Sequence, residues 1–519
     1  MLSVYIVMQA YCINRLSLTY DEPSFAAYGM TILKFQGKKD IQQFDTKLPA
    51  TALNMLPRVM EQIFNPEVKK TGEEADKDVI NGRYISLLLT VLLGLIIYCW
   101  SAELYNNKIA VFSLLLYLLC PDILAHGIFV STDIYAALFL TATFYFLWKY
   151  RQSNNVTYFM LSSLSVALAQ ISKFSMVHLF ILFPLLLLFT KNTTTENSLK
   201  KAKPIYLFLL FIGINWFIIS ISHFFYQEFM MLDNYEFKSE IFRSLQNMFG
   251  KNAAYIPVPL PSSYISSMDL VMYVDKLGGG EQGSLNAAPY IFGETSRYGF
   301  WYYYLVALFY KLPISTLLIW LTALVYFILR FNKIRFLKHD LFFLLPVVYY
   351  FIYLSFFYTA QIGVRHIIII YPLLFIFSGN IIKQFFENRK QAFLILLLGW
   401  QAISVLLYFP HFLPYTNEFI INKKNAYKKI ADSNLCYGEG KKFLSAYLEK
   451  HKDISYAPDS PQAGKFVVEV NDYLDLTQVP STKYIWMRGL KPVEHIHSEY
   501  LVFDISPSMA DSLQKERYK

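Results

Sequence analysis

Long apolar runs, separated by short polar segments, dominate the pattern of this sequence. Eleven runs are near the ~20 residues that a helix needs to cross hydrocarbon. The pattern therefore predicts an α-helical polytopic membrane protein with about eleven transmembrane helices. The predicted spans are 1–18, 84–103, 109–127, 130–149, 155–172, 174–190, 204–224, 302–331, 340–359, 362–380 and 391–409.

The pattern changes after residue 409. A helix is predicted over 441–450, and alternating apolar residues predict strands over 454–456, 466–470 and 501–505. We therefore expect a transmembrane domain over 1–409 and a small soluble α/β domain over 410–519. In the polar loop 16–83, helical spacing predicts two short helices, 24–35 and 51–64, that lie along the membrane plane.

Basic residues gather in alternate loops, and this sets the predicted orientation. The loops 149–154, 190–203, 330–339 and 383–390 are rich in Lys and Arg, and such loops favour the cytoplasmic side. The N-terminus is then cytoplasmic. Loops 16–83 and 225–301, the turns 125–133 and 359–366, and the tail then lie outside the cytoplasm. These outer segments hold most of the Pro, Gly, His and paired charges, so we expect the function there.

Composition agrees with a membrane protein. Hydrophobic residues make up 55% of the chain and charged residues 16%, whereas soluble proteins carry about 25% charged residues. The net charge of +9 comes mostly from the short basic loops. The net charge therefore does not indicate a nucleic-acid partner. The apolar composition predicts the lipid bilayer as the partner. The four cysteines form no CxxC motif and no disulfide framework.

Two acidic positions stand out on the predicted outer side. Asp21 and Glu22 directly follow the first apolar run, and carboxylates beside a membrane are costly unless they are used. Asp133 opens the fourth span on the same side. Each position also has a purely structural interpretation, because Asp21 could cap the helix that starts near Ser24 and Asp133 could cap its own span.

Several short strings share an order and spacing that resembles a known family. They are Asp21-Glu-Pro23, Pro121–Gly127 with Ser131-Thr-Asp133, Gly293–Ser296 with Lys311-Leu-Pro313, Gly363–His366 with Tyr371-Pro372, and Pro410–Glu418. They resemble the GT-C glycosyltransferases, specifically the bacterial relatives of protein O-mannosyltransferases, and are similar to lipid A aminoarabinose transferases. The resemblance implies an integral enzyme, in a bacterial inner membrane, that takes a sugar from a polyprenyl phosphate.

The resemblance also implies roles for the acidic residues. Asp21 matches the acidic residue that the family uses after its first span, which makes it the predicted catalytic base. Glu22 is expected to tune or orient it. Asp133 matches a second acidic residue that approaches the first, and a nearby like charge would raise the pKa of one carboxyl. Relatives often have Asp-Trp where this chain has Cys436-Tyr437, so any role of that string is in doubt here.

Three basic residues are the predicted ligands of the donor phosphate. Arg365 and His366 lie in a short outer turn after Gly363, and an arginine there can bind phosphate with two parallel hydrogen bonds. Its alternative is contact with lipid headgroups. Lys47 resembles the basic position of the aminoarabinose transferases, although many relatives have His-Pro-Pro there.

Aromatic and histidine side chains give weaker signals. Trp301 and Tyr303 could contact a sugar or lipid, but an aromatic belt at the membrane surface is the favoured interpretation. His126 could line the same site or only satisfy backbone groups. His495 and His497 have the alternate spacing of two metal ligands on one strand, but they lack a third partner.

The combined prediction is an inverting glycosyltransferase that acts on an acceptor hydroxyl of a protein, lipid or envelope glycan. A polyprenyl-phosphate linkage carries one negative charge, which the basic set could neutralise, so no metal or other cofactor is expected. The alternative is a divalent ion held by Asp21, Glu22 and Asp133. A flippase or transporter of a lipid-linked sugar would favour repeats and polar midspan helices, and a non-catalytic membrane scaffold is a third interpretation.

Overall fold

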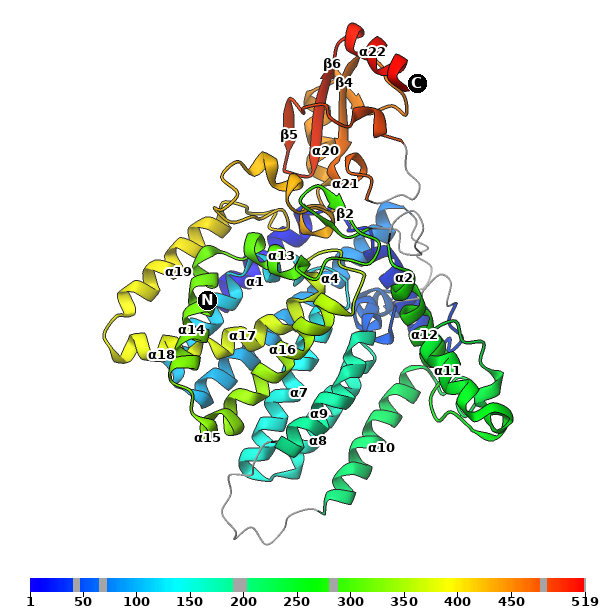
Figure 1. Ribbon diagram of the computed structural model, residues 1–519, viewed down its shortest axis with the longest axis vertical. Coiled ribbons are helices and arrows are strands. Elements are labelled where there is room, and N and C mark those ends of the chain that lie inside the picture. The colour runs from blue at the N-terminus through cyan, green and yellow to red at the C-terminus, as the bar shows by residue number, and fades with distance from the viewer. Residues whose placement is uncertain (41–46, 65–71, 190–202, 280–287, 477–482, 518–519) are drawn as a thin grey trace.

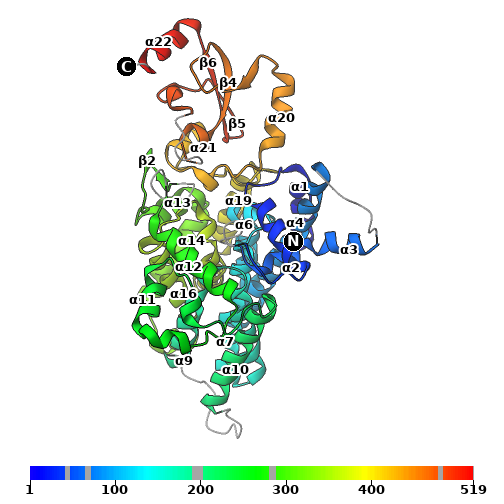
Figure 2. The ribbon, with the colours of Figure 1, turned by 90° about the vertical axis from the view of Figure 1, so that its right-hand side faces the viewer.

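The computed structural model describes residues 1–40, 47–64, 72–189, 203–279, 288–476 and 483–517. A body of helices fills most of the molecule, and a small sheet with its own helices lies at one end of the long axis (Figures 1 and 2). Most of the predicted basic loop 190–203 falls outside the described residues.

The body contains most of the helices of the chain, and α4 contacts many of them, including α1, α5, α7 and α17. The bounds are α1 Leu2–Arg15, α2 Glu22–Leu33, α3 Leu56–Phe64, α4 Glu73–Leu104, α5 Asn107–Leu118, α6 Pro121–His126, α7 Asp133–Ser153, α8 Val156–Gln170, α9 Leu179–Phe189, α10 Pro204–Ser222, α11 Glu240–Phe249, α12 Ser262–Leu277, α13 Tyr303–Lys311, α14 Ile314–Leu329, α15 Lys333–Arg335, α16 Leu341–Phe356, α17 Tyr371–Phe377, α18 Gly379–Glu387 and α19 Gln391–Leu406.

Four helical segments among the described residues have the length and apolar composition to cross a membrane. They are Glu74–Leu104, Pro204–Ser222, Lys333–Phe356 and Ile368–Glu387. Five further apolar helical segments have 10–17 residues. The mostly helical fold agrees with the predicted class, and the count of eleven spans stays a prediction.

Some predicted spans are interrupted. The run 302–331 forms two helices, α13 and α14, which meet at Pro313. Proline has no backbone N–H and its ring clashes with the preceding turn, so a helix cannot run through it without a kink or break. The run 109–127 is likewise divided before Pro121. Apolar pattern alone does not reveal these breaks.

The predicted helices of loop 16–83 exist, but the second one is not a surface helix along its whole length. It forms a 3-10 helix, Pro49–Met55, followed by α3. Most of the 3-10 segment is buried. Asn54 explains this position, because its Nδ2 donates to Gly82 O (2.8 Å) and its Oδ1 accepts from the Tyr135 hydroxyl (2.7 Å). These bonds hold the segment against α4 and α7.

The tail contains a four-stranded sheet of order β3-β4-β6-β5, formed by Ile454–Tyr456, Gly464–Glu469, Tyr500–Ile505 and Glu494–Ile496. Strands β3 and β4 are parallel, and the other pairs are antiparallel. The helices of the tail are α20 (Lys441–Lys450), α21 (Val470–Tyr473) and α22 (Pro507–Arg517). The three predicted strands are confirmed to within two residues at each end, and the division into domains at 409 stays a prediction.

Candidate active site

The stretch between α1 and α2 carries Asp21 to the boundary between the body and the tail. Its backbone pairs with the tail: Ser17 N donates to Glu439 O (2.8 Å), and Tyr20 N donates to Tyr437 O (3.0 Å). Asp21 then occupies the N-cap position of α2, but its side chain makes no capping hydrogen bond. The carboxylate is therefore available for other partners.

Asp21 pairs instead with Arg365 and Tyr437. Arg365 Nη1 lies 2.8 Å from Asp21 Oδ2, and the Tyr437 hydroxyl donates to the same oxygen. The guanidinium also lies over the Tyr437 ring, 4.7 Å from its centroid. The side chain of Asp21 is 33% exposed, whereas that of Arg365 is 11% exposed. The carboxylate therefore remains accessible while a nearly buried cation contacts it.

The turn that carries Arg365 is positioned by close backbone contact. Gly363 has φ +119°, and a Cβ there would lie 2.3 Å from Ser433 Oγ. The next amide, Val364 N, donates to Asn434 Oδ1 (3.1 Å). Only glycine fits this conformation and this approach. Gly363 thus fixes the turn against the segment that precedes Tyr437.

Charge lowers the pKa of the proposed base. Burial alone would raise the pKa of Asp21, but the positive charges of Arg365 and Lys47, with the hydrogen bond from Tyr437, hold it at about 2. Lys47 Nζ also lies over the Phe25 ring, 4.7 Å from its centroid. Two of the predicted phosphate ligands thus act electrostatically on the predicted base.

Glu22 lies in a different environment from its neighbour. It is fully buried, and Arg83 of α4 donates to both carboxylate oxygens, at 2.8 and 2.6 Å. Backbone N–H groups of Thr19 and Val130 also donate to it, at 2.7 and 2.9 Å. With four donors on its two oxygens, Glu22 anchors the loop that carries Asp21, and its role in orienting Asp21 stays a prediction.

Asp133 pairs with Lys173, which lies between α8 and α9. Asp133 is the first residue of α7, and its Oδ1 lies 2.6 Å from Lys173 Nζ. The same Nζ lies 3.4 Å from His366 Nδ1. The N-cap position of α7 is held by Thr132, whose side chain makes no capping bond. The contacts run from Asp133 through Lys173 to His366.

Several nitrogens near Arg365 are buried without a hydrogen-bond partner among the described residues. They are Arg365 Nε, His366 Nε2 and His126 Nε2. His366 follows Arg365 directly, and α6, which ends at His126, packs against the Val364–His366 turn. Buried donors of this kind normally find a partner, and an anion would satisfy the guanidinium.

The two aromatic candidates, Trp301 and Tyr303, differ in exposure. Trp301 is 59% exposed and stacks on Phe356 with ring centroids 6.3 Å apart. Tyr303 is 1% exposed, and its hydroxyl accepts from Asn434 Nδ2 at 3.0 Å. Tyr303 therefore packs in the core, and its contact with a sugar or lipid stays a prediction.

The three predicted carboxylates do not converge on one point. Asp21, Glu22 and Asp133 pair with three different cations, Arg365, Arg83 and Lys173. This arrangement does not form the oxygen cage that the alternative metal site would need. The sequence does not predict that Tyr437 contacts Asp21, or that Arg83 and Lys173 pair with Glu22 and Asp133. At Tyr437 its only signal is the departure from the family pattern.

Part of the chain matches a known family. Residues 76–221 match the model of the family described as dolichyl-phosphate-mannose-protein mannosyltransferase. The matched stretch contains Arg83, Asp133 and Lys173. The resemblance to the protein O-mannosyltransferase type of GT-C glycosyltransferase is thus confirmed over these residues. Comparison with curated protein sequences gave no match.

Solved structures give distant similarities. Crystal structures of ArnT from Cupriavidus metallidurans, in the apo state and bound to undecaprenyl phosphate, have TM-scores of 0.48 and 0.49. Both are 13% identical, over 82% of this chain and 67% of theirs. The Archaeoglobus fulgidus oligosaccharyltransferase, in complex with Zn and sulfate, has a TM-score of 0.43 and 12% identity, over 78% of this chain and 52% of that one. These values assign no residue roles.

Proposed function

We propose that this chain is an inverting glycosyltransferase, which moves a sugar from a polyprenyl-phosphate donor to an acceptor hydroxyl. The observation that carries the proposal is the contact between the accessible Asp21 carboxylate and the nearly buried Arg365 guanidinium, 2.8 Å apart. The family match over residues 76–221 supports the same class of reaction.

The donor phosphate binds at the cation side of this pair. Arg365 Nε is buried and lacks a partner among the described residues, and Lys47 adds a second positive charge near Asp21. Phosphate competes with Asp21 for the guanidinium, because two of its oxygens can accept parallel hydrogen bonds from the planar N–H groups of arginine. His366, held by Lys173 at 3.4 Å, lies beside the same guanidinium.

Asp21 is the general base. The acceptor oxygen attacks the anomeric carbon as the bond from that carbon to the phosphate oxygen breaks, and the polyprenyl phosphate leaves as an anion. The acceptor proton passes to Asp21. Positive charge from Arg365 and Lys47 stabilises the leaving phosphate, so no acid is needed at that oxygen. Asp133 keeps Lys173 and His366 in place.

The proposed topology places this chemistry outside the cytoplasm. Eleven spans with a cytoplasmic N-terminus, in a bacterial inner membrane, put the tail and the Asp21 loop on the outer face. The basic loops of the sequence support this orientation. The acceptor is a hydroxyl of a protein, lipid or envelope glycan.

Mass spectrometry of envelope glycoconjugates, with and without the chain, tests the function. We expect a sugar on one class of acceptor that disappears when the chain is absent, and polyprenyl-phosphate sugar that accumulates in its place. Lipid-linked sugar that crosses the bilayer in reconstituted vesicles, with no glycosidic product, would instead establish the flippase alternative.

Replacing Arg365 with Gln should weaken binding of polyprenyl phosphate. Loss of a hydrogen bond to a charged group costs about 1.5–3 kcal/mol, which corresponds to roughly 10- to 150-fold in affinity. Titration of the purified protein with polyprenyl phosphate measures the change. Arg330→Gln, at an exposed position, is the matched control. Equal affinities for the two variants would remove Arg365 from the phosphate site.

The pH dependence of kcat/KM should change in the same variant. A base must be deprotonated to act, and the pKa of Asp21 is about 2 in the free protein. Asp21 should therefore produce no loss of kcat/KM between pH 5 and 8. In Arg365→Gln one opposing charge is gone while burial remains, so the pKa rises and the acid limb moves upward. An acid limb at the same pH in both proteins would contradict this account of the Asp21 pKa.

A further inference from the structure

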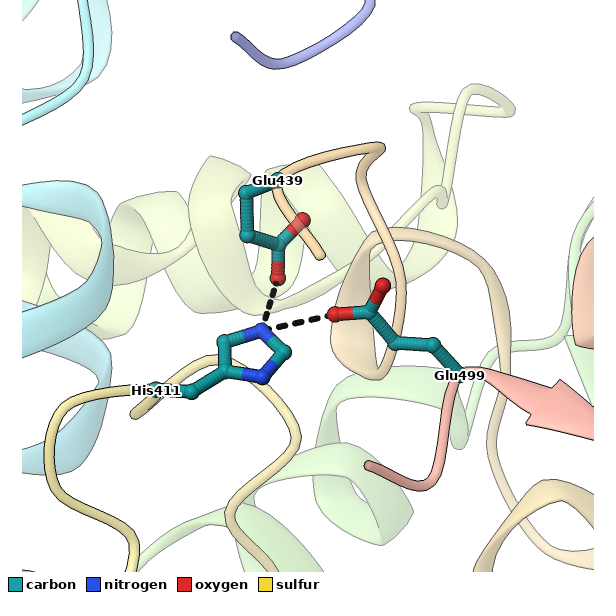
Figure 3. A group of neighbouring side chains, drawn as sticks. All are labelled: His411, Glu439 and Glu499. Carbon is teal, nitrogen blue, oxygen red and sulfur yellow. Dashed lines mark hydrogen bonds and ion pairs between the residues drawn. The ribbon is translucent and has the colours of Figure 1, made fainter. Parts of the chain in front are cut away.

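A second cluster of ionisable side chains lies at the junction of the body and the tail, apart from the Asp21 site. His411 follows α19, Glu439 precedes α20, and Glu499 lies in the turn between β5 and β6 (Figure 3). His411 Nε2 lies 2.8 Å from Glu439 Oε1 and 2.6 Å from Glu499 Oε1. The side chain of His411 is 4% exposed, and those of the glutamates are fully buried.

Two carboxylates of this cluster face the same imidazole nitrogen. Nε2 of an imidazole carries at most one hydrogen, and here it faces two carboxylate oxygens. Glu499 Oε1 has no hydrogen-bond partner among the described residues, although it points at this nitrogen. The ion pairs that these residues form within the described chain are only with each other.

Two buried carboxylates that share one cationic partner are expensive in a protein interior. Moving an isolated carboxylate out of water costs several kcal/mol or more unless a cation or a proton neutralises it. A divalent cation at the point faced by the three side chains would neutralise both carboxylates. It would also give the unpartnered Glu499 oxygen a ligand bond.

We propose that His411, Glu439 and Glu499 form a binding site for a divalent transition-metal ion of the Zn²⁺ class. Imidazole nitrogen and carboxylate oxygen are common zinc ligands. The three ligand atoms lie within 4.8 Å of one another. A tetrahedral ion with bonds of about 2.0–2.2 Å holds its ligand atoms roughly 3.3–3.6 Å apart. The two distances from His411 Nε2, 2.8 and 2.6 Å, would therefore lengthen by about 1 Å or less on binding.

The site would stabilise the contacts of the Asp21 loop without taking part in the chemistry. The backbone carbonyl of Glu439 accepts from Ser17 N (2.8 Å), and its Oε2 accepts from Tyr437 N (2.9 Å). Tyr437 in turn contacts Asp21. A bound ion would therefore tie the loop after α19 and the sheet of the tail to the segment that carries Asp21. The proposal does not depend on the transferase activity.

The histidine pair of the sequence does not form this site. His495 is not part of the ligand group. His497 is exposed and packs on Phe443, and its ring centroid lies 6.1 Å from that of His411. In the proposed ligand group, His411 and Glu439 are 28 positions apart in the sequence. No local spacing therefore predicts the group.

Metal content of the purified full-length chain tests the proposal directly. The protein is stripped with EDTA in detergent, dialysed against Zn²⁺, passed through a desalting column, and analysed by inductively coupled plasma mass spectrometry. We expect about one zinc ion per wild-type chain, and at least about tenfold less in Glu499→Gln and Glu439→Gln, because each variant removes one anionic ligand. His451→Ala and Glu494→Gln, at exposed positions, should bind like wild type.

Zinc content and melting temperature each support or overturn the proposed metal site. Equal zinc in wild type and in a folded Glu499→Gln or Glu439→Gln variant would mean adventitious binding and would overturn the proposal. If neither variant folds, the melting temperature of the stripped wild type decides, because a ligand of the folded state must raise it. No rise on adding Zn²⁺ would overturn the proposal as well. Neither readout depends on sugar transfer, so the proposed function stands or fails separately.

Discussion

Replacing Asp21 with Asn should reduce sugar transfer by about 10²- to 10⁴-fold, which is the usual contribution of a general base. The amide keeps the shape of the side chain but cannot take the acceptor proton. The hydroxyl of Tyr437 can still donate to its oxygen, so the local fold should survive. Turnover of a polyprenyl-phosphate sugar in membranes that contain equal amounts of each protein measures the effect.

Asp453→Asn is the matched control for this experiment. Asp453 is 58% exposed and pairs with Lys465 in the tail, so the same chemical change there should leave turnover unaltered. Full turnover by Asp21→Asn at normal protein level would remove Asp21 as the base. Asp133 would then be the next carboxylate to test, because its partner Lys173 also contacts His366.

Replacing Arg83 with Leu should destabilise the chain by about 3–5 kcal/mol, the usual cost of leaving one member of a buried ion pair alone. The change strands the Glu22 carboxylate, which is fully buried and receives both of its ionic contacts from Arg83. It also removes the bond from Arg83 Nη2 to Ser17 O (2.6 Å). Thermal unfolding of the detergent-solubilised protein measures the loss.

Two further variants show whether the buried charge causes the loss. Lys149→Leu breaks a half-exposed pair with Glu103 at 2.8 Å, and such pairs contribute only about 0–1 kcal/mol. The double variant Arg83→Leu with Glu22→Leu removes both buried charges and should recover much of the stability. A single Arg83 variant as stable as the Lys149 variant would contradict the anchoring role of this pair.

Much of the helical architecture follows from local pattern. Apolar runs with helical period can satisfy their backbone groups only as helices in an apolar setting, so a mostly helical chain was predictable. The same holds for strand 454–456, whose bounds match β3. The breaks at Pro121 and Pro313 were readable in principle from proline chemistry. The burial of Pro49–Met55 was not, because it depends on Asn54 reaching two distant helices.

The candidate site residues can be recognised in the sequence, whereas their contacts depend on the tertiary structure. An acid pair beside an apolar run and an arginine in a short outer turn are visible as residues, and the chain brings Asp21 and Arg365 together across 344 positions. The adjacent carboxylates of Asp21 and Glu22 nevertheless lie in different environments. Asp21 is partly exposed beside Arg365, whereas Glu22 is buried against Arg83. Two neighbours in sequence point in different directions from a helix start, and only the packed surroundings select their partners.

From its residues alone, the chain specifies where helices form, which loops carry positive charge, and which polar residues are unusual in an apolar protein. These properties depend on the period and chemistry of neighbouring residues. Tertiary structure decides which cation meets each carboxylate, that Tyr437 reaches Asp21, and that His411, Glu439 and Glu499 meet in one buried cluster. Those contacts join segments far apart in the chain, and their energy depends on burial and distance, which no local pattern encodes.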